Sequence, residues 1–238
     1  MKTLFSLLAL GAGLHCQPAP PRDNLDLYYL VFLRPIADRK PLPKAEAERI
    51  QQAHMANIRK MVQDQILVAA GPMEASPSIS GIFFFKAASL EQAQNIAAQD
   101  PTVAEKRNAA DVHPWWGPKG VGAPYFQWKK EHPDAPDQMR TFQFCLLRKG
   151  PAWTGDRTAE NEQALAGHFE FIERTHREGK LVAAGPFDDD GDLRGLYIFQ
   201  MASIDEARKL VEEDPAVKTG RFRSELHKWW SADHVFPQ

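Results

Sequence analysis

Two histidines and two aspartates at matching places in the chain could take part in proton transfer. They are His54 and His168, and Asp100 and Asp214. An imidazole with a pKa of about 6.5 accepts or releases a proton near neutral pH. A carboxylate beside it can hold one tautomer and stabilise the imidazolium that forms. Each histidine is therefore a candidate general base, and a carboxylate could orient it.

Both residue types also have interpretations that involve no chemistry. His54 and His168 stand beside apolar residues at helical spacing, so each could be a buried histidine satisfied by a backbone carbonyl. Asp100 and Asp214 each precede a proline, and Asp-Pro is a favoured helix start in which the aspartate is the N-cap. One carboxylate has several acceptor sites, so capping and catalysis are compatible. The sequence leaves both interpretations open.

The matching pairs belong to an internal repeat. Its landmarks recur 114 residues later, at His54 and His168, Gly71-Pro72 and Gly185-Pro186, Gly81 and Gly195, and Asp100-Pro101 and Asp214-Pro215. Between residues 54 and 116 the copies align without a gap, and 20 of 63 positions are identical. A gapless match of this length indicates two copies of one fold, so a site in one copy should have a counterpart in the other.

Each copy has the pattern of the element order β-α-β-β-α-β. In the first copy, strands are expected at 28–34, 66–70, 81–86 and around His113, and helices at 43–63 and from Ser89. The second copy has the same elements about 114 residues later. In both copies we expect the second strand to stop at the Gly-Pro that follows it, because proline cannot donate to a strand ladder.

This order predicts an α+β fold in which each copy is a ferredoxin-like repeat. One antiparallel sheet would carry two helices on a single face, and its other face would need cover. Two copies packed sheet to sheet cover each other, so the sequence predicts an intrachain pseudo-dimer of the dimeric α/β-barrel type. Its parts are a first repeat at 28–116, an irregular linker at 117–138 and a second repeat at 139–238.

Further candidate binding residues lie at strand ends. Two arginines could clamp an anionic substrate as planar donors, or they could be surface arginines. Each copy ends with a histidine followed by two adjacent tryptophans, and an aromatic pocket there could hold a ligand. Alternatively, the tryptophans fill the barrel end or the seam between the copies, with the histidine at the rim. The candidate substrate contacts are Arg34, His113, Trp115, Arg148, His227 and Trp229.

These motifs together resemble the YCII-related (YciI-like) domain family. The resemblance rests on the helix histidine, the stretch Glu-Gly-Lys-Leu-Val-Ala-Ala-Gly-Pro at 178–186, Gly195, Asp-Pro-Ala-Val at 214–217 and Gly220-Arg221, and it covers about 28–116 and 142–230. The family is similar in fold to the dimeric α/β-barrel superfamily. The resemblance implies that His168 with Asp214, and His54 with Asp100, are catalytic pairs. One branch of the family performs a cofactor-free elimination on a chlorinated hydroxyquinol.

The first copy departs from the family pattern at two glycines. Gln65 stands where the second copy has Gly179, and Lys106 stands where it has Gly220. Glycine tolerates left-handed backbone at such helix ends, so its loss predicts changed turns in the first copy. The second pair, His168 with Asp214, is therefore expected to be the better preserved site.

Composition and motifs exclude several functional classes. A net charge of −2 gives no general attraction to nucleic acid or to anionic membranes. The chain has no dinucleotide or Walker glycine motif, no His-Glu-x-x-His and no Cys-x-x-Cys. The acidic run 188–192 lacks the glutamate of a calcium loop and predicts a solvated turn. We expect a small-molecule substrate or ligand, no nucleic-acid partner, no metal and no cofactor.

The N-terminus predicts export. Residues 1–16 have the positive start and short apolar run of a signal peptide, and 17–27 form a flexible lead-in. We therefore expect a periplasmic or extracellular protein. Cys16 follows the run where a bacterial lipoprotein carries its lipidated cysteine, so a lipid anchor there and an incidental cysteine both stay open. Cys145 is expected to be a small core residue.

Two functional hypotheses follow from these observations. The first is a cofactor-independent lyase or isomerase that moves a proton on a small organic, for instance aromatic, molecule held in the barrel. The second is a non-catalytic barrel that binds a small ligand or has a structural role. The enzyme hypothesis requires the histidine and the aspartate of a pair to lie within hydrogen-bond reach and to face one cavity.

Overall fold

A computed structural model describes residues 23–237, so the predicted signal peptide and Cys16 lie outside the described residues. The first repeat comprises β1 (Leu25–Pro35), α1 (Lys44–Gln63), β2 (Leu67–Glu74), β3 (Gly81–Phe85), α2 (Leu90–Ala98), α3 (Pro101–Ala104) and β4 (Asn108–Pro118). Helix α4 (Ala123–Glu131) follows. The second repeat comprises β5 (Met139–Lys149), α5 (Ala159–Arg177), β6 (Leu181–Pro186), β7 (Leu193–Phe199), α6 (Ile204–Val211), α7 (Pro215–Lys218) and β8 (Phe222–Ala232).

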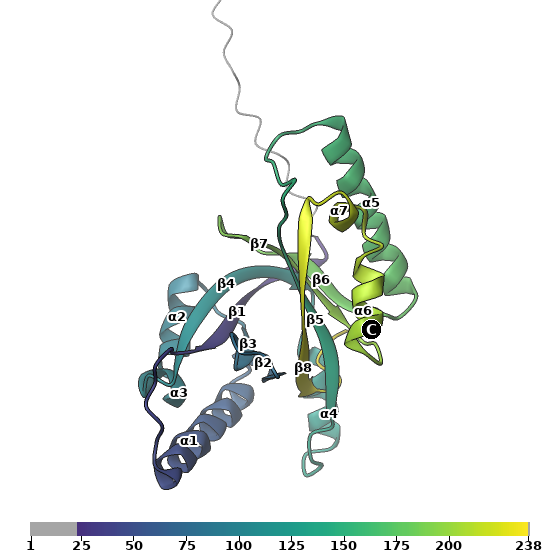
Figure 1. Cartoon of the computed structure of the whole chain (residues 1–238). Coiled ribbons are helices and arrows are strands. Elements are labelled where there is room, and N and C mark those ends of the chain that lie inside the picture. Colours follow the sequence, from purple (N-terminus) through teal and green to yellow (C-terminus); the bar gives the residue numbers. More distant parts are fainter. Residues whose placement is uncertain (1–22, 238) are drawn as a thin grey trace, which may run out of the picture.

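The eight strands form one antiparallel sheet that is nearly closed into a barrel. Their order is β4-β1-β3-β2-β8-β5-β7-β6, and the pairing of β2 with β8 joins the two repeats. At the far ends of the sheet, Trp115 of β4 bridges to Phe187, and the backbone N–H of Asp188 donates to the Pro114 carbonyl at 2.9 Å. The helices of each repeat lie outside the barrel (Figure 1). The predicted pseudo-dimer of two ferredoxin-like repeats is confirmed.

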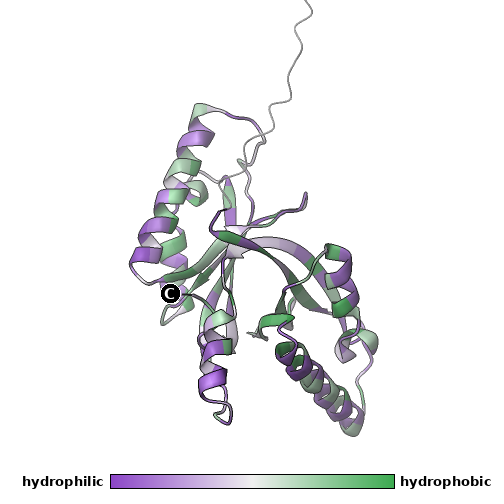
Figure 2. Ribbon diagram, turned by 180° about the vertical axis from the view of Figure 1, so that it is seen from behind, coloured by the Kyte–Doolittle hydropathy of each residue, from purple (hydrophilic) through white to green (hydrophobic). Residues whose placement is uncertain are grey.

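The strands are apolar on both faces because each face is covered. Along β1, Tyr28, Leu30 and Phe32 point into the barrel, whose core draws on both repeats. Their neighbours, among them Tyr29 and Val31, face the helices of their own repeat and form a separate cluster. The long helices α1 and α5 turn polar residues to solvent and apolar residues to the sheet (Figure 2). No helix within residues 23–237 is long and apolar enough to cross a membrane.

The seam between the repeats depends on two buried indoles and two glycines. The Trp229 Nε1–H donates to the Gly71 carbonyl at 3.2 Å, and the Trp115 Nε1–H donates to the Gly185 carbonyl at 3.0 Å. A Cβ on Gly71 would lie 1.9 Å from the carbonyl oxygen of Trp230, and a Cβ on Gly185 would lie 1.8 Å from that of Trp116. Only glycine lets the strands of the two repeats approach so closely.

This role of glycine corrects one prediction about the strands. We expected the second strand of each copy to stop at Gly-Pro, but β2 runs through Gly71 and Pro72 to Glu74, and β6 includes both Gly185 and Pro186. The Gly-Pro step is the place where one repeat meets the other. Pro72 directly precedes Met73 and Glu74, the residues of β2 that pair with β8.

The prediction of changed turns in the first copy was also wrong. Gln65 has φ 55° where Gly179 has φ 68°, and Lys106 has φ 54° where Gly220 has φ 71°. The closing hydrogen bond after the first helix is preserved, from the Ile66 N–H to the Met61 carbonyl at 3.0 Å. The fixed route from helix to strand keeps a non-glycine residue left-handed, at a cost of roughly 1 kcal/mol.

The linker is not wholly irregular, because it contains α4. Strand β4 continues to Pro118, and Gly122 with φ 85° precedes α4, which has a proline in its first turn. The helix is tied to the C-terminal segment, since the Gly122 N–H donates to the Val235 carbonyl. Its Tyr125 and the preceding Val121 pack against one end of the barrel core. The linker therefore adds a wall to one side of the molecule only.

The close approach at the seam leads to a prediction about stability. Replacing Gly71 or Gly185 by alanine forces a Cβ against a backbone carbonyl, so each change should lower the free energy of unfolding by about 1–3 kcal/mol. Gly155→Ala is the matched control, because an added Cβ there meets nothing within 4 Å. Urea unfolding followed by circular dichroism measures the effect. Seam variants as stable as the control would contradict this account of the interface.

Candidate active site

The first histidine–aspartate pair lies where α1 passes the start of α3. The Nδ1 atom of His54 is 2.8 Å and 3.0 Å from the two carboxylate oxygens of Asp100. The Asp100 side chain is 1% exposed and that of His54 is 13% exposed. The imidazole also stacks on the Phe83 ring of β3, with 5.9 Å between the ring centroids. The pair is therefore held rigidly at the edge of the helix–sheet core.

Asp100 has a structural role as well as its contact with His54. Its Oδ1 accepts from the Thr102 backbone N–H at 3.0 Å, which caps α3, and from the Thr102 hydroxyl at 2.6 Å. Its Oδ2 also accepts from the Asn57 amide at 3.2 Å. The two interpretations of the Asp-Pro motif thus coexist in one residue.

These contacts keep Asp100 ionised. Burial raises the pKa of Asp100, but hydrogen bonds from His54 and Thr102 outweigh burial and leave that pKa below its ordinary value. The charged carboxylate can only accept, so Nδ1 of His54 carries a proton. Nε2 makes no hydrogen bond with any residue in 23–237. When the ring is neutral, Nε2 is the nitrogen that can accept a proton.

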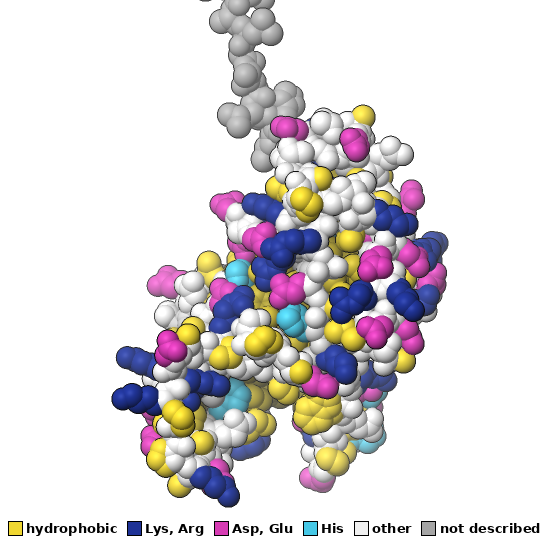
Figure 3. Space-filling view, in the orientation of Figure 1, with side chains coloured by type: hydrophobic (Ala, Val, Ile, Leu, Met, Phe, Trp, Pro, Cys, Tyr) yellow, Lys and Arg dark blue, Asp and Glu magenta, His cyan; other side chains and the backbone are white. Residues whose placement is uncertain are grey.

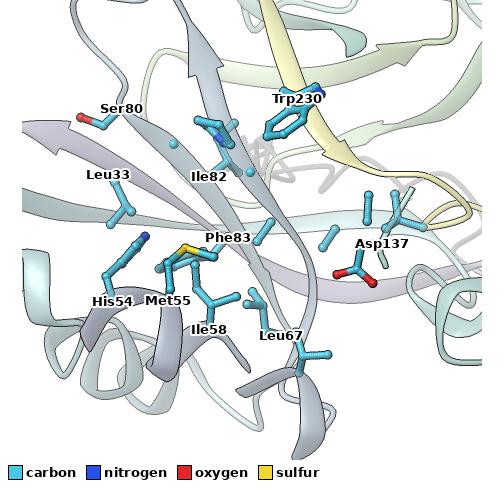
Figure 4. A pocket seen from close by; sticks show the side chains of 18 of the residues that line it. Leu33, His54, Met55, Ile58, Leu67, Ser80, Ile82, Phe83, Asp137 and Trp230 are labelled. Carbon is cyan, nitrogen blue, oxygen red and sulfur yellow. The ribbon is translucent and has the colours of Figure 1, made fainter. Parts of the chain in front are cut away.

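His54 lines a cavity of about 470 Å³. Helix α1 forms one wall with Met55 and Ile58, and β2 forms the floor. The opposite wall includes Trp230 of β8 and Asp137, which follows α4 (Figure 4). In the space-filling view, hydrophobic side chains gather around the hollow between α1 and α4 (Figure 3). The cavity thus uses the first repeat, the linker and the second repeat together.

A chain of polar side chains runs from this cavity to Asp100. The Ser80 hydroxyl donates to Asn108 Oδ1 at 3.0 Å, and the Asn108 amide donates to the Thr102 hydroxyl at 3.0 Å. Thr102 in turn donates to Asp100. Ser80, Asn108 and Thr102 all line the cavity. Hydrogen bonds donated in one direction support the negative charge of the carboxylate.

The second pair has the same contact but different neighbours. Nδ1 of His168 lies 2.9 Å from Oδ2 of Asp214, and Asp214 Oδ1 caps α7 through the Ala216 N–H at 2.9 Å. The Tyr197 hydroxyl also reaches this carboxylate at 2.9 Å and lies 3.0 Å from His168 Nδ1. Burial, followed by the charge of Asp214, raises the pKa of Tyr197 well above its ordinary value, so the phenol stays protonated and donates.

Aromatic and apolar groups replace the polar chain in the second repeat. Phe222 and Ala216 stand where the first repeat has Asn108 and Thr102, and the Phe222 ring packs against His168 with 5.4 Å between centroids. His168 lines neither the cavity beside His54 nor the shallow groove along α5. We expected the second pair to be the better preserved site, but the geometry favours the first as a place where a ligand could meet a histidine.

The predicted substrate contacts lie elsewhere. Trp115 and Trp229 are fully buried in the seam, in agreement with the alternative interpretation of these residues. The other four form two ion-pair clusters. In one, Nε of Arg34 binds Asp111 at 2.7 Å, and His113 Nε2 lies 3.0 Å from the same carboxylate. None of these residues lines the cavity beside His54.

The second cluster repeats the first with a longer carboxylate. Nε of Arg148 binds Glu225 at 2.6 Å, and His227 Nε2 lies 2.8 Å from Glu225. The clusters differ in two contacts. His113 Nδ1 also meets Asp189 of the second repeat at 2.6 Å, and Arg148 also lies 3.3 Å from Asp192. The arginines are therefore committed to carboxylates within the chain.

Charge pairing in these clusters shifts several pKa values. The hydrogen bond from His113, together with Arg34, lowers the pKa of Asp111 to about 2 despite burial. The hydrogen bond from His227, together with Arg148, likewise lowers that of Glu225 to about 2. Burial lowers the pKa of His113, but Asp111 and Asp189 outweigh it and raise that pKa above its ordinary value.

Sequence reasoning missed the residues that distinguish the two sites. Ser80, Asn108 and Trp230 were not among its candidates, although the copies differ at the first two, where the second copy has Arg194 and Phe222. Comparing the copies for polar-to-aromatic changes around the shared pair would have identified the contrast. Among residues 23–237, no three histidine, cysteine or acidic residues are arranged to hold a metal ion.

Comparison with known proteins agrees with the repeat and with the barrel. The profile described as the YCII-related domain matches residues 29–115 and 141–230. Uncharacterized protein YjpA of Bacillus subtilis (strain 168) is 33% identical over 69 residues, which are 29% of this chain and 79% of that protein.

Two solved structures share the fold. The candidate chlorite dismutase TA0507 has a TM-score of 0.54 and 10% identity, over 87% of this chain and 94% of its own. A point mutant of chlorite dismutase from Candidatus Nitrospira defluvii has a TM-score of 0.55 and 10% identity, over 85% of this chain and 90% of its own. At this level of identity the likeness shows the dimeric α/β-barrel fold alone.

The lowered pKa values lead to a prediction about acid stability. A carboxyl whose folded pKa is depressed stabilises the fold above its unfolded pKa of about 4, and this stability is lost as pH falls through the folded value near 2. Asp111→Asn combined with Glu225→Gln should therefore cost on the order of 1 kcal/mol at pH 7 after solvent screening, and should flatten the loss of stability between pH 4 and 2.

Urea midpoints measured across this pH range provide the test. Glu173→Gln is the control, because Glu173 is exposed and makes none of the ion pairs described among residues 23–237. An acid limb as steep in the double variant as in the wild type would show that these clusters do not stabilise the fold.

Proposed function

Because the chain belongs to the YCII-related domain family through both of its repeats, we propose that it is an enzyme of the dimeric α/β-barrel superfamily. Its active site is the cavity beside His54. It acts as a lyase or isomerase that moves a proton on a small organic molecule without a cofactor. The observation that supports this most strongly is one imidazole that is held by an ionised carboxylate and also lines a cavity of about 470 Å³.

The proposed mechanism uses the free nitrogen of His54. Nε2 takes a proton from an acidic C–H or O–H of the substrate, and Asp100 stabilises the imidazolium through Nδ1–H. In an elimination, the electron pair left on the substrate expels the leaving group. In an isomerisation, the imidazolium returns the proton to another atom of the same substrate. Asp100 itself stays ionised because Thr102 and Asn57 also donate to it.

The second repeat fits the alternative hypothesis of a structural role. Its carboxylate caps α7 and accepts from Tyr197, and Phe222 packs on His168. These contacts occupy Nδ1 of His168 and both carboxylate oxygens of Asp214, and the His168 ring packs beside Phe222 without lining the cavity that His54 lines. In this proposal the second His–Asp pair stabilises the fold, and the first pair carries out the chemistry.

Export is part of the proposal as well, because the apolar run before Cys16 has the pattern of a signal peptide. Expression of the full chain in a bacterial host, followed by fractionation and mass measurement, tests it. We expect a processed chain in the periplasm or the medium, and a mass increment on Cys16 only if that residue is lipidated. A full-length, unprocessed chain confined to the cytoplasm would contradict export.

The catalytic proposal is tested by proton exchange, which requires no knowledge of the product. Carbon acids from a panel of small enolisable compounds are incubated in D₂O and followed by NMR. For any compound that the wild type exchanges, His54→Ala should lose roughly 10²–10⁴-fold in rate, because the general base is removed. Asp100→Asn should also lose rate, since the wrong tautomer becomes available.

His168→Ala is the matched control, because it removes the equivalent histidine of the second repeat. We expect its rate to stay within about threefold of wild type when circular dichroism shows an intact fold, since distant sites act independently. Undiminished exchange by His54→Ala, or loss of exchange in folded His168→Ala alone, would overturn the assignment.

A further inference from the structure

The charges around the cavity select against one class of ligand. Among residues 23–237, no lysine or arginine lines the cavity beside His54. Its formally charged lining residue is Asp137, which accepts from the Tyr125 hydroxyl at 3.0 Å and pairs with Lys129 at 3.1 Å. Behind His54 stands the negative charge of Asp100. Because Lys129 is already paired with Asp137, an anionic ligand would give up its hydration without meeting an unpaired cation.

From this geometry we propose that the cavity takes a neutral, predominantly apolar molecule with one small polar group, and that it rejects phosphorylated, sulfonated or carboxylated compounds. This inference rests on the proposed function, since it names the substrate class of that same site. Burying an unpaired ionised group costs far more than burying a neutral one, so the absence of a cation is a strong filter.

The arginines that could have bound an anion are held away from the cavity. Arg34 and Arg148 are committed to Asp111 and Glu225. The second repeat has an arginine, Arg194, at the position that corresponds to Ser80. The cavity of the first repeat thus has the neutral hydroxyl of Ser80 at the position where the second repeat has the positively charged guanidinium of Arg194.

The polar end of the cavity suits one neutral polar group. Ser80 uses its proton on Asn108, so its oxygen can still accept a hydrogen bond. Asn108 uses one amide proton on Thr102 and keeps the second. A hydroxyl or carbonyl group placed there would lie at the same end of the cavity as His54 (Figure 4).

The apolar part of the ligand would contact both repeats. Met55 on α1 is 40% exposed, Met139 of β5 is 38% exposed and Trp230 of β8 is 47% exposed, and all three line the cavity. Large apolar side chains left half-exposed around one hollow indicate a surface that a ligand covers. Trp230 comes from the second repeat, so the site of the first repeat is incomplete without the second.

The test uses two fluorescent probes with one skeleton. N-phenyl-1-naphthylamine is neutral, and 8-anilino-1-naphthalenesulfonate adds a sulfonate to the same rings. With the purified full chain, the neutral probe should bind, and the sulfonate should bind at least roughly tenfold more weakly. Trp230→Ala should weaken binding of the neutral probe about tenfold, because a central aromatic contact is lost. Trp116→Ala, the equivalent change in the first repeat, is the control.

Ser80→Arg places in the cavity the residue type that the second copy has at the same position. This variant should shift the ratio of the two affinities toward the sulfonate by roughly tenfold, because the anion then gains a partner. Ser78→Arg adds the same charge on the exposed loop outside the cavity lining and should leave the ratio unchanged.

Each outcome decides the inference. Equal or tighter binding of the sulfonate by the wild type, failure of both probes to bind, or insensitivity to Trp230→Ala would overturn it. Probe binding does not depend on proton transfer by His54. If His54→Ala exchanges protons at the normal rate, the proposed function is wrong, but the preference for the neutral probe can still hold. If proton exchange depends on His54 but the sulfonate probe binds as tightly as the neutral one, the proposed function holds and the inference about the substrate class is wrong.

Discussion

The contact between each buried indole and the glycine carbonyl of the opposite repeat is the constraint on which the rest of this molecule depends. Trp115 and Trp229 can make it only because Gly185 and Gly71 admit the neighbouring backbone. Once the two strand pairs meet, the inner faces of both repeats are removed from water, which no single ferredoxin-like sheet achieves alone. The same contact brings β8 beside β2 and so carries Trp230 to the wall of the cavity that His54 faces.

Within each repeat, one aspartate both caps a helix and contacts a histidine. Asp100 and Asp214 both begin a short helix and both hold a histidine. The shared contact alone therefore says little about function, because either aspartate would be favoured for capping. The surroundings make the distinction. A chain of donors supports Asp100 and opens on a cavity, whereas a phenol and packed rings enclose Asp214.

Local and periodic features of the fold could be predicted from the sequence. The repeat and the residue patterns predicted the element order, and the uncovered sheet faces predicted the barrel. The resemblance to the family paired each histidine with its aspartate. The cavity could not be predicted, because its walls come from three separate parts of the chain. The left-handed Gln65 and Lys106 show a second limit, since tertiary packing overrode the local preference for glycine. The expectation that the second pair is the better preserved site did not take Tyr197 and Phe222 into account. A family motif shows which residues its members share, but it does not show which side chains pack beside them.

Covalent fusion has a consequence that an ancestral pair of identical subunits could not reach. In a homodimer every substitution appears in both subunits. Aromatic side chains that pack around the histidine of one subunit therefore also pack around the histidine of the other. A single polypeptide has one connection between its halves, and here that connection contains α4, which walls one pocket only. The surroundings of His54 and His168 can therefore differ within one molecule. In the proposed function, this difference lets the first half carry out the chemistry while the second half supports the fold.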